Sequence, residues 1–257
     1  MRHIVALSGG KDSVAMALAL REYEPLMPAG WREEHPHLSC HPSVPDYEYV
    51  YTPTAWELPE VDEHIERLQL ILGRPITPIP APTMDQVIEV QKALPNFRMR
   101  FCTRLIKIVP FEKFIRAVGE CTVYVGIRAD EVEGDREGVD WDRIEGVTRR
   151  FPMDEWGWDL DAVLSYLKCR GIVIPERTDC DACFFQTLYE WWLFWKKYPE
   201  RWALREAIEE RFGHTFRSDQ RDTWPASMKG LRQRFEAGDV PKDRRKKRKT
   251  MCSVCAR

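Results

Sequence analysis

The chain has 257 residues, of which 44% are hydrophobic, so it is long enough to bury one large core or a core with an appended region. Its 39 basic and 41 acidic residues give a formal charge of -2, which argues neither for nor against a nucleic-acid partner. The apolar stretches fall short of the roughly 18 to 20 residues of a membrane helix, and the first residues lack the pattern of a signal peptide. We therefore expect a cytoplasmic protein that does not associate with membranes.

The first residues predict a strand, a glycine turn and a helix. An apolar run at 3–7 precedes Gly9 and Gly10, and apolar residues then recur at helical spacing through 12–23. Further elements are predicted in chain order: a strand at 47–52, a helix at 61–72, an extended segment at 74–82 and a strand at 122–131. Strands that alternate with helices predict an α/β fold with a doubly wound, mainly parallel sheet and helices on both faces.

Residues 30–45 contain three prolines, three histidines and one cysteine, with neither helical nor strand periodicity. We expect a surface loop inserted before the second strand. A metal site is the minority alternative there, because such spacing also arises by chance in a loop rich in proline and histidine. Its ligands would be His35, His37, Cys40 and His41.

The composition changes after a helix predicted from Leu160 and ended by Gly171. Residues 183–213 hold four of the ten tryptophans and predict two helices, broken at Pro199 and ended by Gly213. We expect these tryptophans to pack the helices onto the main domain, with base stacking as the alternative. We divide the chain into a nucleotide-binding α/β domain at 1–175 and a helical, cysteine-bearing C-terminal region at 176–257.

The stretch "SGGKDS", from Ser8 to Ser13, lies between the first strand and the first helix. Glycines at such a position let backbone N–H groups converge on an anion, and the helix N-terminus adds partial positive charge. The serine hydroxyls can donate to phosphate oxygens, Lys11 can neutralise them, and Asp12 can help to hold Mg²⁺. The spacing differs from GxxxxGK[ST] and from GxGxxG, so this is a different phosphate loop.

"SGGKDS" resembles the PP-loop of the adenine-nucleotide alpha-hydrolase superfamily, the N-type ATP pyrophosphatases. The resemblance implies binding of ATP and cleavage between its α and β phosphates. Three further stretches resemble the phosphoadenosine phosphosulfate reductase family within that superfamily: "YTPTAWELPEV" at 51–61, "RMRFCTRLIKIVPFEKF" at 98–114 and "VGIRADEVEGDRE" at 125–137. Together they extend the resemblance over roughly residues 3–200.

The resemblance implies the following site. Arg128 follows a strand at its carboxyl end, where ligands bind in open sheets, and Asp130 and Glu131 are candidates to hold Mg²⁺ or Arg128. Arg100, Arg104 and Lys107 concentrate cations that face the polyphosphate or the phosphate of a substrate. We predict as catalytic residues Lys11, Asp12, Arg128 and Cys102. We predict as nucleotide-binding residues Ser8, Gly9, Gly10, Lys11, Asp12, Ser13, Arg104, Lys107, Arg128 and Glu131.

Two departures separate this chain from the sulfonucleotide reductases that it resembles. Those reductases generally have a degraded first loop, whereas Lys11 and Asp12 are present here. They also carry a C-terminal Glu-Cys-Gly-x-His segment, whereas this chain ends in "MCSVCAR". We therefore favour an ATP pyrophosphatase of the sulfurtransferase type. The alternatives are a reductase of adenylyl sulfate or phosphoadenylyl sulfate, and an inactive nucleotide-binding adaptor.

Two CxxC pairs suggest a metal centre rather than disulfides in a cytoplasmic protein. Tetrahedral thiolate ligation suits zinc, but the 68 residues between the pairs make it less expected than in a compact zinc ribbon. The family resemblance favours an iron–sulfur cluster of the 4Fe-4S type, and redox-active or sulfur-carrying thiols are a third alternative. The candidate ligands are Cys102, Cys180, Cys183, Cys252 and Cys255.

The C-terminal run "KDRRKKRK" carries a local charge of +6, which the net charge of the chain conceals. It is either an arm that contacts the phosphates of DNA or RNA, or a disordered solubilising tail. Relatives by resemblance include enzymes of DNA phosphorothioation and tRNA thiolation. We therefore expect a nucleic-acid acceptor and a sulfur donor such as a cysteine desulfurase, and leave a homodimer open.

Overall fold

The fold is described from a computed structural model, which describes residues 1–23, 45–131, 144–219 and 221–243. Several sequence predictions fall outside these ranges. They concern the histidine-rich loop with Cys40, the end of the stretch at 125–137, and the basic run from Arg244 with Cys252 and Cys255.

Five parallel strands form the sheet that the described residues build, in the order β3-β2-β1-β4-β5. The strands are β1 (Arg2–Leu7), β2 (Tyr47–Tyr51), β3 (Ile76–Pro78), β4 (Cys121–Tyr124) and β5 (Val147–Arg150). The chain winds from β1 to β2 and β3 on one side and then returns to β4 on the other. The order therefore reverses between β1 and β4, and a crevice for a ligand is expected beyond their carboxyl ends.

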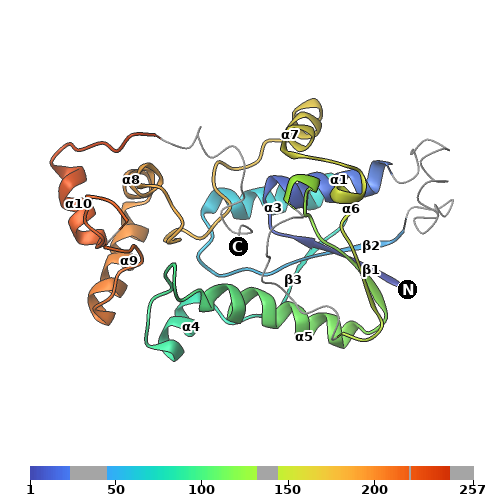
Figure 1. The fold of residues 1–257 in the computed structure, drawn as a ribbon, viewed down its shortest axis with the longest axis horizontal. Coiled ribbons are helices and arrows are strands. Elements are labelled where there is room, and N and C mark those ends of the chain that lie inside the picture. The colour runs from blue at the N-terminus through green and yellow to red at the C-terminus, as the bar shows by residue number, and fades with distance from the viewer. Residues whose placement is uncertain (24–44, 132–143, 220, 244–257) are drawn as a thin grey trace.

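Helices cover both faces of this sheet, which confirms the predicted doubly wound architecture (Figure 1). One face carries α1 (Lys11–Tyr23), α3 (Pro59–Leu72), α6 (Pro152–Glu155) and α7 (Leu160–Cys169). The opposite face carries α5 (Val109–Val118), where Ile115 packs with Ile4 and Val123. Helix α1 is buried along most of its length, between the sheet and its neighbours, so its N-terminal turn is held firmly in place.

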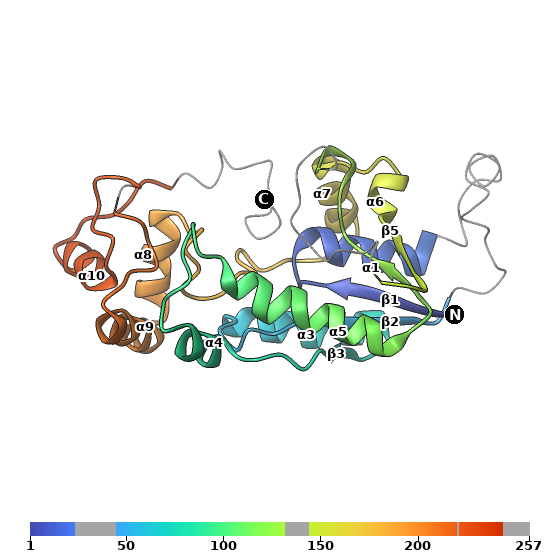
Figure 2. The same ribbon diagram turned by 60° about the horizontal axis from the view of Figure 1, so that its bottom comes forward.

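The C-terminal helices are α8 (Leu188–Lys197), α9 (Pro199–Phe212) and α10 (Met228–Glu236), which lie at one end of the molecule (Figure 2). Pro199 begins α9 and Gly213 ends it in the left-handed conformation, as predicted. Trp191 and Trp202 are buried in one apolar cluster with Trp56 and with residues of α4 (Met84–Gln91). The predicted packing role of these two tryptophans is confirmed, while the division at residue 175 stays a prediction.

Within the described ranges, no helix is both long enough and apolar enough to cross a bilayer.

Glu209 lies in α9 and joins this helix to the segments that follow it. Its side chain is 5% exposed, and its two carboxylate oxygens accept hydrogen bonds from the N–H groups of Phe216 (3.0 Å) and Met228 (2.6 Å). Burial raises the pKa of Glu209 from 4.5 to about 7, and the charge of Glu206 adds to the rise, although the two backbone bonds oppose it. The carboxyl group is therefore partly protonated near neutral pH in the folded protein.

We expect the contribution of Glu209 to stability to depend on pH. Because its pKa is higher in the folded protein than in the unfolded chain, that contribution is complete below about pH 4.5 and is lost as the pH rises through about 7. The difference in free energy of unfolding between the wild type and Glu209→Gln should change in that sense, as measured by urea denaturation at several pH values. A difference that stays constant between about pH 5 and about pH 8 would contradict this assignment.

Candidate functional site

The loop between β1 and α1 is closed by its own serines. Gly9 has a φ of +73°, which a residue with a side chain rarely adopts. The Ser8 N–H donates to Ser13 Oγ (3.1 Å), and Ser13 Oγ donates to the Gly10 carbonyl (3.1 Å). This network bends the backbone tightly at the N-terminus of α1, as the phosphate-loop prediction requires.

Arg128 joins this loop to the segment that follows β4. Its side chain is fully buried, and one guanidinium nitrogen donates to Asp12 Oδ1 at 2.9 Å. Asp130 and Glu131 pair with the same guanidinium at 2.8 Å and 3.0 Å. Burial disfavours the charge of Arg128, but the hydrogen bonds and charges of these three carboxylates outweigh it and raise the pKa of Arg128. Arg128 is thus a permanent cation at the switch point of the sheet.

Asp12 bridges two cations. Lys11 Nζ donates to Asp12 Oδ2 at 3.0 Å, while Oδ1 accepts from Arg128. Each carboxylate oxygen thus pairs with one cation, and Asp12 positions both. The magnesium contact of Asp12 stays a prediction.

Gly126 allows the two segments to approach. A Cβ atom on Gly126 would lie 3.0 Å from the backbone nitrogen and Cα of Ser13. The segment after β4 therefore presses against the first turn of α1, which brings Arg128 within reach of Asp12. Gly126 belongs to the stretch at 125–137 that resembles the family, but no role was predicted for it from the sequence.

A cavity of 340 Å³ opens beside the loop. One wall consists of Ser8, Gly10 to Ser13, and the segment at 125–126. The other wall consists of residues 174–179 and Glu190. Its volume lies within the range of ligand clefts, and its polar lining at the end of β1 fits the position expected for a ligand.

The second wall was missed by the sequence analysis. Arg177 donates to Asp179 Oδ1 (3.0 Å) and to the Cys180 carbonyl (2.8 Å), so it links the cavity to the first CxxC pair. Thr178 Oγ1 lies 3.5 Å from the position of a Cβ on Gly10. The one available signal was the polar run at 176–179 directly before that pair, but its closeness to residue 10 follows from the fold alone.

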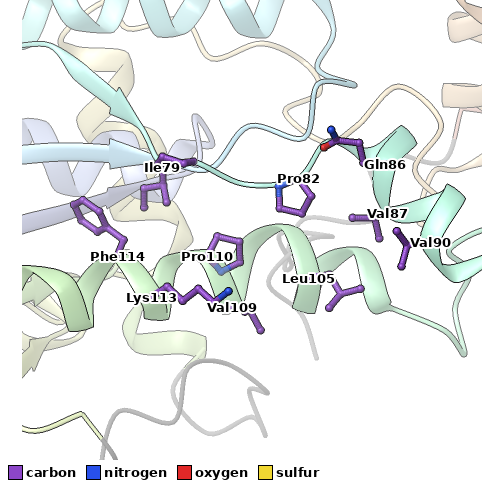
Figure 3. A pocket seen from close by; sticks show the side chains of 11 residues that line it. Ile79, Pro82, Gln86, Val87, Val90, Leu105, Val109, Pro110, Lys113 and Phe114 are labelled. Atoms are coloured by element: carbon purple, nitrogen blue, oxygen red, sulfur yellow. The ribbon is translucent and has the colours of Figure 1, made fainter.

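A larger apolar groove of 570 Å³ lies between α5 and the extended segment after β3 (Figure 3). Figure 3 shows Ile79, Pro110 and Phe114 at one end of it, with Lys113 nearby. Its other polar side chain, Gln86, forms the capping box of α4 with Thr83. The groove thus offers little that would bind phosphate, and the loop stays the predicted nucleotide site.

The first CxxC pair forms a turn that is anchored by a buried ion pair. Asp181, which is fully buried, accepts from Nε of Arg205 on α9 at 3.0 Å and from its terminal nitrogen at 3.0 Å. The guanidinium of Arg205 lies 3.7 Å from the centre of the Trp56 ring. The Asp181 N–H donates to the Trp56 carbonyl at 2.8 Å. Helix α9 therefore fixes the turn against the chain that follows β2.

The described thiols of the predicted metal centre are Cys102, Cys180 and Cys183. Burial raises the pKa of all three, to about 12 for Cys180, while the charge of Lys107 acts in the opposite sense on Cys102 and Cys180. Within the described ranges, however, no three side chains of histidine, cysteine, aspartate or glutamate form a group that could hold a metal ion. The described part of the donor set is incomplete for a cluster, and we derive no chemical step through one.

The predicted site residues lie partly at the loop and partly on the segment around Cys102. Ser8 to Ser13, Arg128 and Glu131 come together at the loop. Cys102, Arg104 and Lys107 do not line the cavity; Lys107 acts on the thiols of Cys102 and Cys180 instead. Arg104 and Lys107 lie on a π-helical segment, Thr103–Ile108, a backbone form that is frequent at functional sites.

A pair of glycine substitutions tests the loop. Gly9→Ala and Gly213→Ala both force alanine into the left-handed region, at φ of +73° and +64°, so each should destabilise the protein by about 1 to 2 kcal/mol. Only Gly9→Ala should also abolish nucleotide binding, measured by titration calorimetry with ATP. Equal affinity of the two variants would show that the nucleotide does not bind at this loop.

A second prediction concerns the buried ion pair between Asp181 and Arg205. Arg205→Ala leaves Asp181 buried without its main partner and should lower the free energy of unfolding by about 3 to 5 kcal/mol. Lys229→Ala is the control, because it removes an exposed pair with Glu210 (3.0 Å) and should change stability by less than about 1 kcal/mol. Similar losses in chemical denaturation would refute the anchoring role of Arg205.

Comparison with known proteins places the chain in a family. The phosphoadenosine phosphosulfate reductase domain matches residues 2–176. No curated protein matches. A solved structure to which the chain is similar is phosphoadenylyl-sulfate (PAPS) reductase from Candida auris in a phosphate complex, with 13% identity, a TM-score of 0.47, and coverage of 68% of this chain and 76% of that one. Because the domain match spans more than half of the sequence, the chain belongs to the phosphoadenosine phosphosulfate reductase domain family, whose members act on nucleotides.

Proposed function

We propose that the protein is an ATP pyrophosphatase, which cleaves ATP to AMP and pyrophosphate and transfers the AMP to an oxygen atom of an acceptor. Sulfur then replaces that oxygen. The observation that carries the proposal is the complete loop, in which Asp12 holds both Lys11 and Arg128 at the N-terminus of α1. A loop that only bound a ready-made sulfonucleotide would have less use for a lysine that borders the cavity and is held there through Asp12 by the buried Arg128.

The loop supplies what pyrophosphate needs as a leaving group. Backbone N–H groups at the start of α1 point to the place where negative charge develops, and the helix dipole adds to their effect. Lys11 is one-quarter exposed and borders the cavity, so its ammonium group can turn from Asp12 to a phosphate oxygen. Arg128 remains buried and holds Asp12 in place during that exchange.

The charge of the cavity supports a role for Mg²⁺. Its lining includes two cations, Lys11 and Arg177, and four carboxylates, those of Asp12, Glu176, Asp179 and Glu190. A triphosphate would therefore meet a net negative wall, which disfavours binding of the free anion. A divalent cation offsets this repulsion by bridging phosphate and carboxylate oxygens, which are its preferred ligands.

The proposed chemistry has two steps. In the first step the acceptor oxygen attacks the α phosphorus of ATP, the bond from that phosphorus to the bridging oxygen breaks, and pyrophosphate leaves with the electron pair. In the second step a sulfur nucleophile from a persulfide-bearing donor such as a cysteine desulfurase attacks the activated carbon or phosphorus of the acceptor, and AMP leaves. The terminal sulfur of the persulfide forms the new bond, so the acceptor is left in a mixed disulfide with the donor cysteine. Two equivalents of an external thiol then reduce that S–S bond, which frees the thiolated acceptor and the donor thiol and oxidises the external thiol to its disulfide. We propose nucleic acid as the acceptor.

The iron–sulfur cluster stays a separate proposal. It would require Cys252 or Cys255 to join Cys102, Cys180 and Cys183, and zinc is the alternative occupant. Neither of the two chemical steps depends on that choice.

The loop lysine tests the function. Lys11→Ala should reduce pyrophosphate release from ATP by about 100- to 1,000-fold, because one donor to the leaving group is lost. The rate is measured with a coupled pyrophosphate assay in the presence of an oligonucleotide acceptor. Lys168→Ala, at an exposed lysine of α7, is the matched control and should retain the wild-type rate. Unchanged turnover in Lys11→Ala would exclude the loop as the phosphate site.

Family membership favours a second candidate, a reductase of phosphoadenylyl sulfate or adenylyl sulfate. Thiol-dependent release of sulfite from either compound, without pyrophosphate release from ATP, would replace the first proposal by this one. Binding of nucleotide without either reaction would instead indicate an adaptor.

A further inference from the structure

We propose that residues 92–107, together with Phe185 and Arg221, form a binding surface for single-stranded nucleic acid; we call it the basic platform. Its role in presenting an acceptor rests on the proposed function. Its ability to bind a nucleic-acid strand does not depend on that function.

The first observation is the positive charge of residues 92–107. Residues 92–107 contain no aspartate or glutamate, whereas the whole chain has slightly more acidic than basic residues. This local excess is the electrostatic signature of a phosphate-binding surface. Arg98 and Arg104 are exposed, so their charges face solvent. The five cations of the segment are Lys92, Arg98, Arg100, Arg104 and Lys107. Lys92 pairs with Glu89, just outside the segment, at 3.2 Å, so the other four supply the excess charge.

The second observation is an exposed aromatic ring among these cations. Phe97 is 53% exposed, and the neighbouring Met99 is 46% exposed. The Phe97 ring meets the Phe185 ring edge to face, with centroids 6.1 Å apart and an interplanar angle of 80°. The Arg100 guanidinium lies 5.1 Å from the centre of Phe185. Bases stack on such rings whatever their sequence, while the adjacent arginines contact the phosphates.

The third observation is that the tip of this segment is held in one conformation. Asn96 Oδ1 accepts hydrogen bonds from the N–H groups of Arg98 (2.9 Å) and Met99 (3.0 Å). The Asn96 N–H donates to the Met99 carbonyl at 3.1 Å. Phe97 and Arg98 thus form the tip of a closed turn. Binding a strand there would order few additional groups, which reduces the entropic cost of association.

Arg221 holds Phe185, the aromatic residue of the platform that lies outside residues 92–107. Its guanidinium donates to the carbonyls of Phe184 (2.6 Å) and Phe185 (3.3 Å), although Arg221 itself is exposed. The nearby carboxylate of Asp222 pairs with Arg217 at 2.8 Å, which reduces its repulsion of a phosphate.

A short stretch of chain joins the platform to the nucleotide cavity. Thr178 and Asp179 line the nucleotide cavity, the CxxC turn follows them, and Phe185 comes two residues after that turn. Figure 2 shows the segment between α4 and α5 running past α8, in agreement with the contact between Phe97 and Phe185. A strand bound at Phe97 would therefore lie next to Cys102 and the CxxC turn.

Binding of a fluorescent single-stranded oligonucleotide to the full-length protein, measured by anisotropy at several salt concentrations, tests this inference. Phe97→Ala should weaken binding by about 5- to 100-fold through the loss of base stacking. Arg98→Ala should lower the slope of log K against log salt by about 0.7, because one phosphate contact is lost. Leu204→Ala, at an exposed apolar residue of α9, is the control and should bind as the wild type does.

The outcomes separate this inference from the proposed function. Lys11→Ala should bind the oligonucleotide as tightly as the wild type, even though it fails to cleave ATP. Wild-type affinity in both Phe97→Ala and Arg98→Ala would overturn the platform and leave ATP cleavage untouched. Preferential binding of duplex, insensitive to Phe97→Ala, would overturn it as well.

Discussion

The buried ion pair between Arg128 and Asp12 is the interaction on which the site depends. It joins the residues after β4 to the first turn of α1 across the point where the strand order reverses. A fully buried guanidinium is tolerable only because three carboxylates surround it, and removing one partner would leave an expensive unpaired charge. The pair therefore fixes Asp12, which in turn holds Lys11. Because Gly126 has no Cβ atom, the segment after β4 can lie close enough to the first turn of α1 for this pair to form.

The sequence predicts the half of the site that is contiguous in the chain. "SGGKDS" between a strand and a helix specifies its own geometry, because glycine, hydroxyl groups and a helix N-terminus act locally. Residues 174–179 could not be predicted as its opposite wall, since they reach residue 10 only through the packing of α7 against α1. The cations around Cys102 were predicted to face the polyphosphate or the phosphate of a substrate. They do not line the cavity at the loop, and their role stays a prediction. The positions of both segments are set by tertiary packing, which their local sequence does not reveal.

The fold shows the same contrast between local and tertiary information. Strands β1 and β2 and helix α3 follow strong apolar patterns and are confirmed. The strand predicted at 122–131 is confirmed only in its first part, because β4 ends at Tyr124 and residues Ala129–Glu131 form a 3-10 helix. The unpredicted edge strand β5 has the sequence "VTRR", with little apolar pattern. Helix α10 was also missed, because Gly230 weakens helix propensity at its third residue. Tertiary packing requires this glycine, because a Cβ atom at position 230 would lie 2.6 Å from a carbon of Pro225.

Two ATP analogues with different bridges show whether the loop binds pyrophosphate as the leaving group. The protein with Mg²⁺ and acceptor is incubated with ATP that carries either an imido bridge between the β and γ phosphates or a methylene bridge between the α and β phosphates. We expect the imido analogue to be cleaved to AMP and imidodiphosphate, and the methylene analogue to be bound but not cleaved. Release of phosphate from the methylene analogue, with the imido analogue intact, would contradict this expectation.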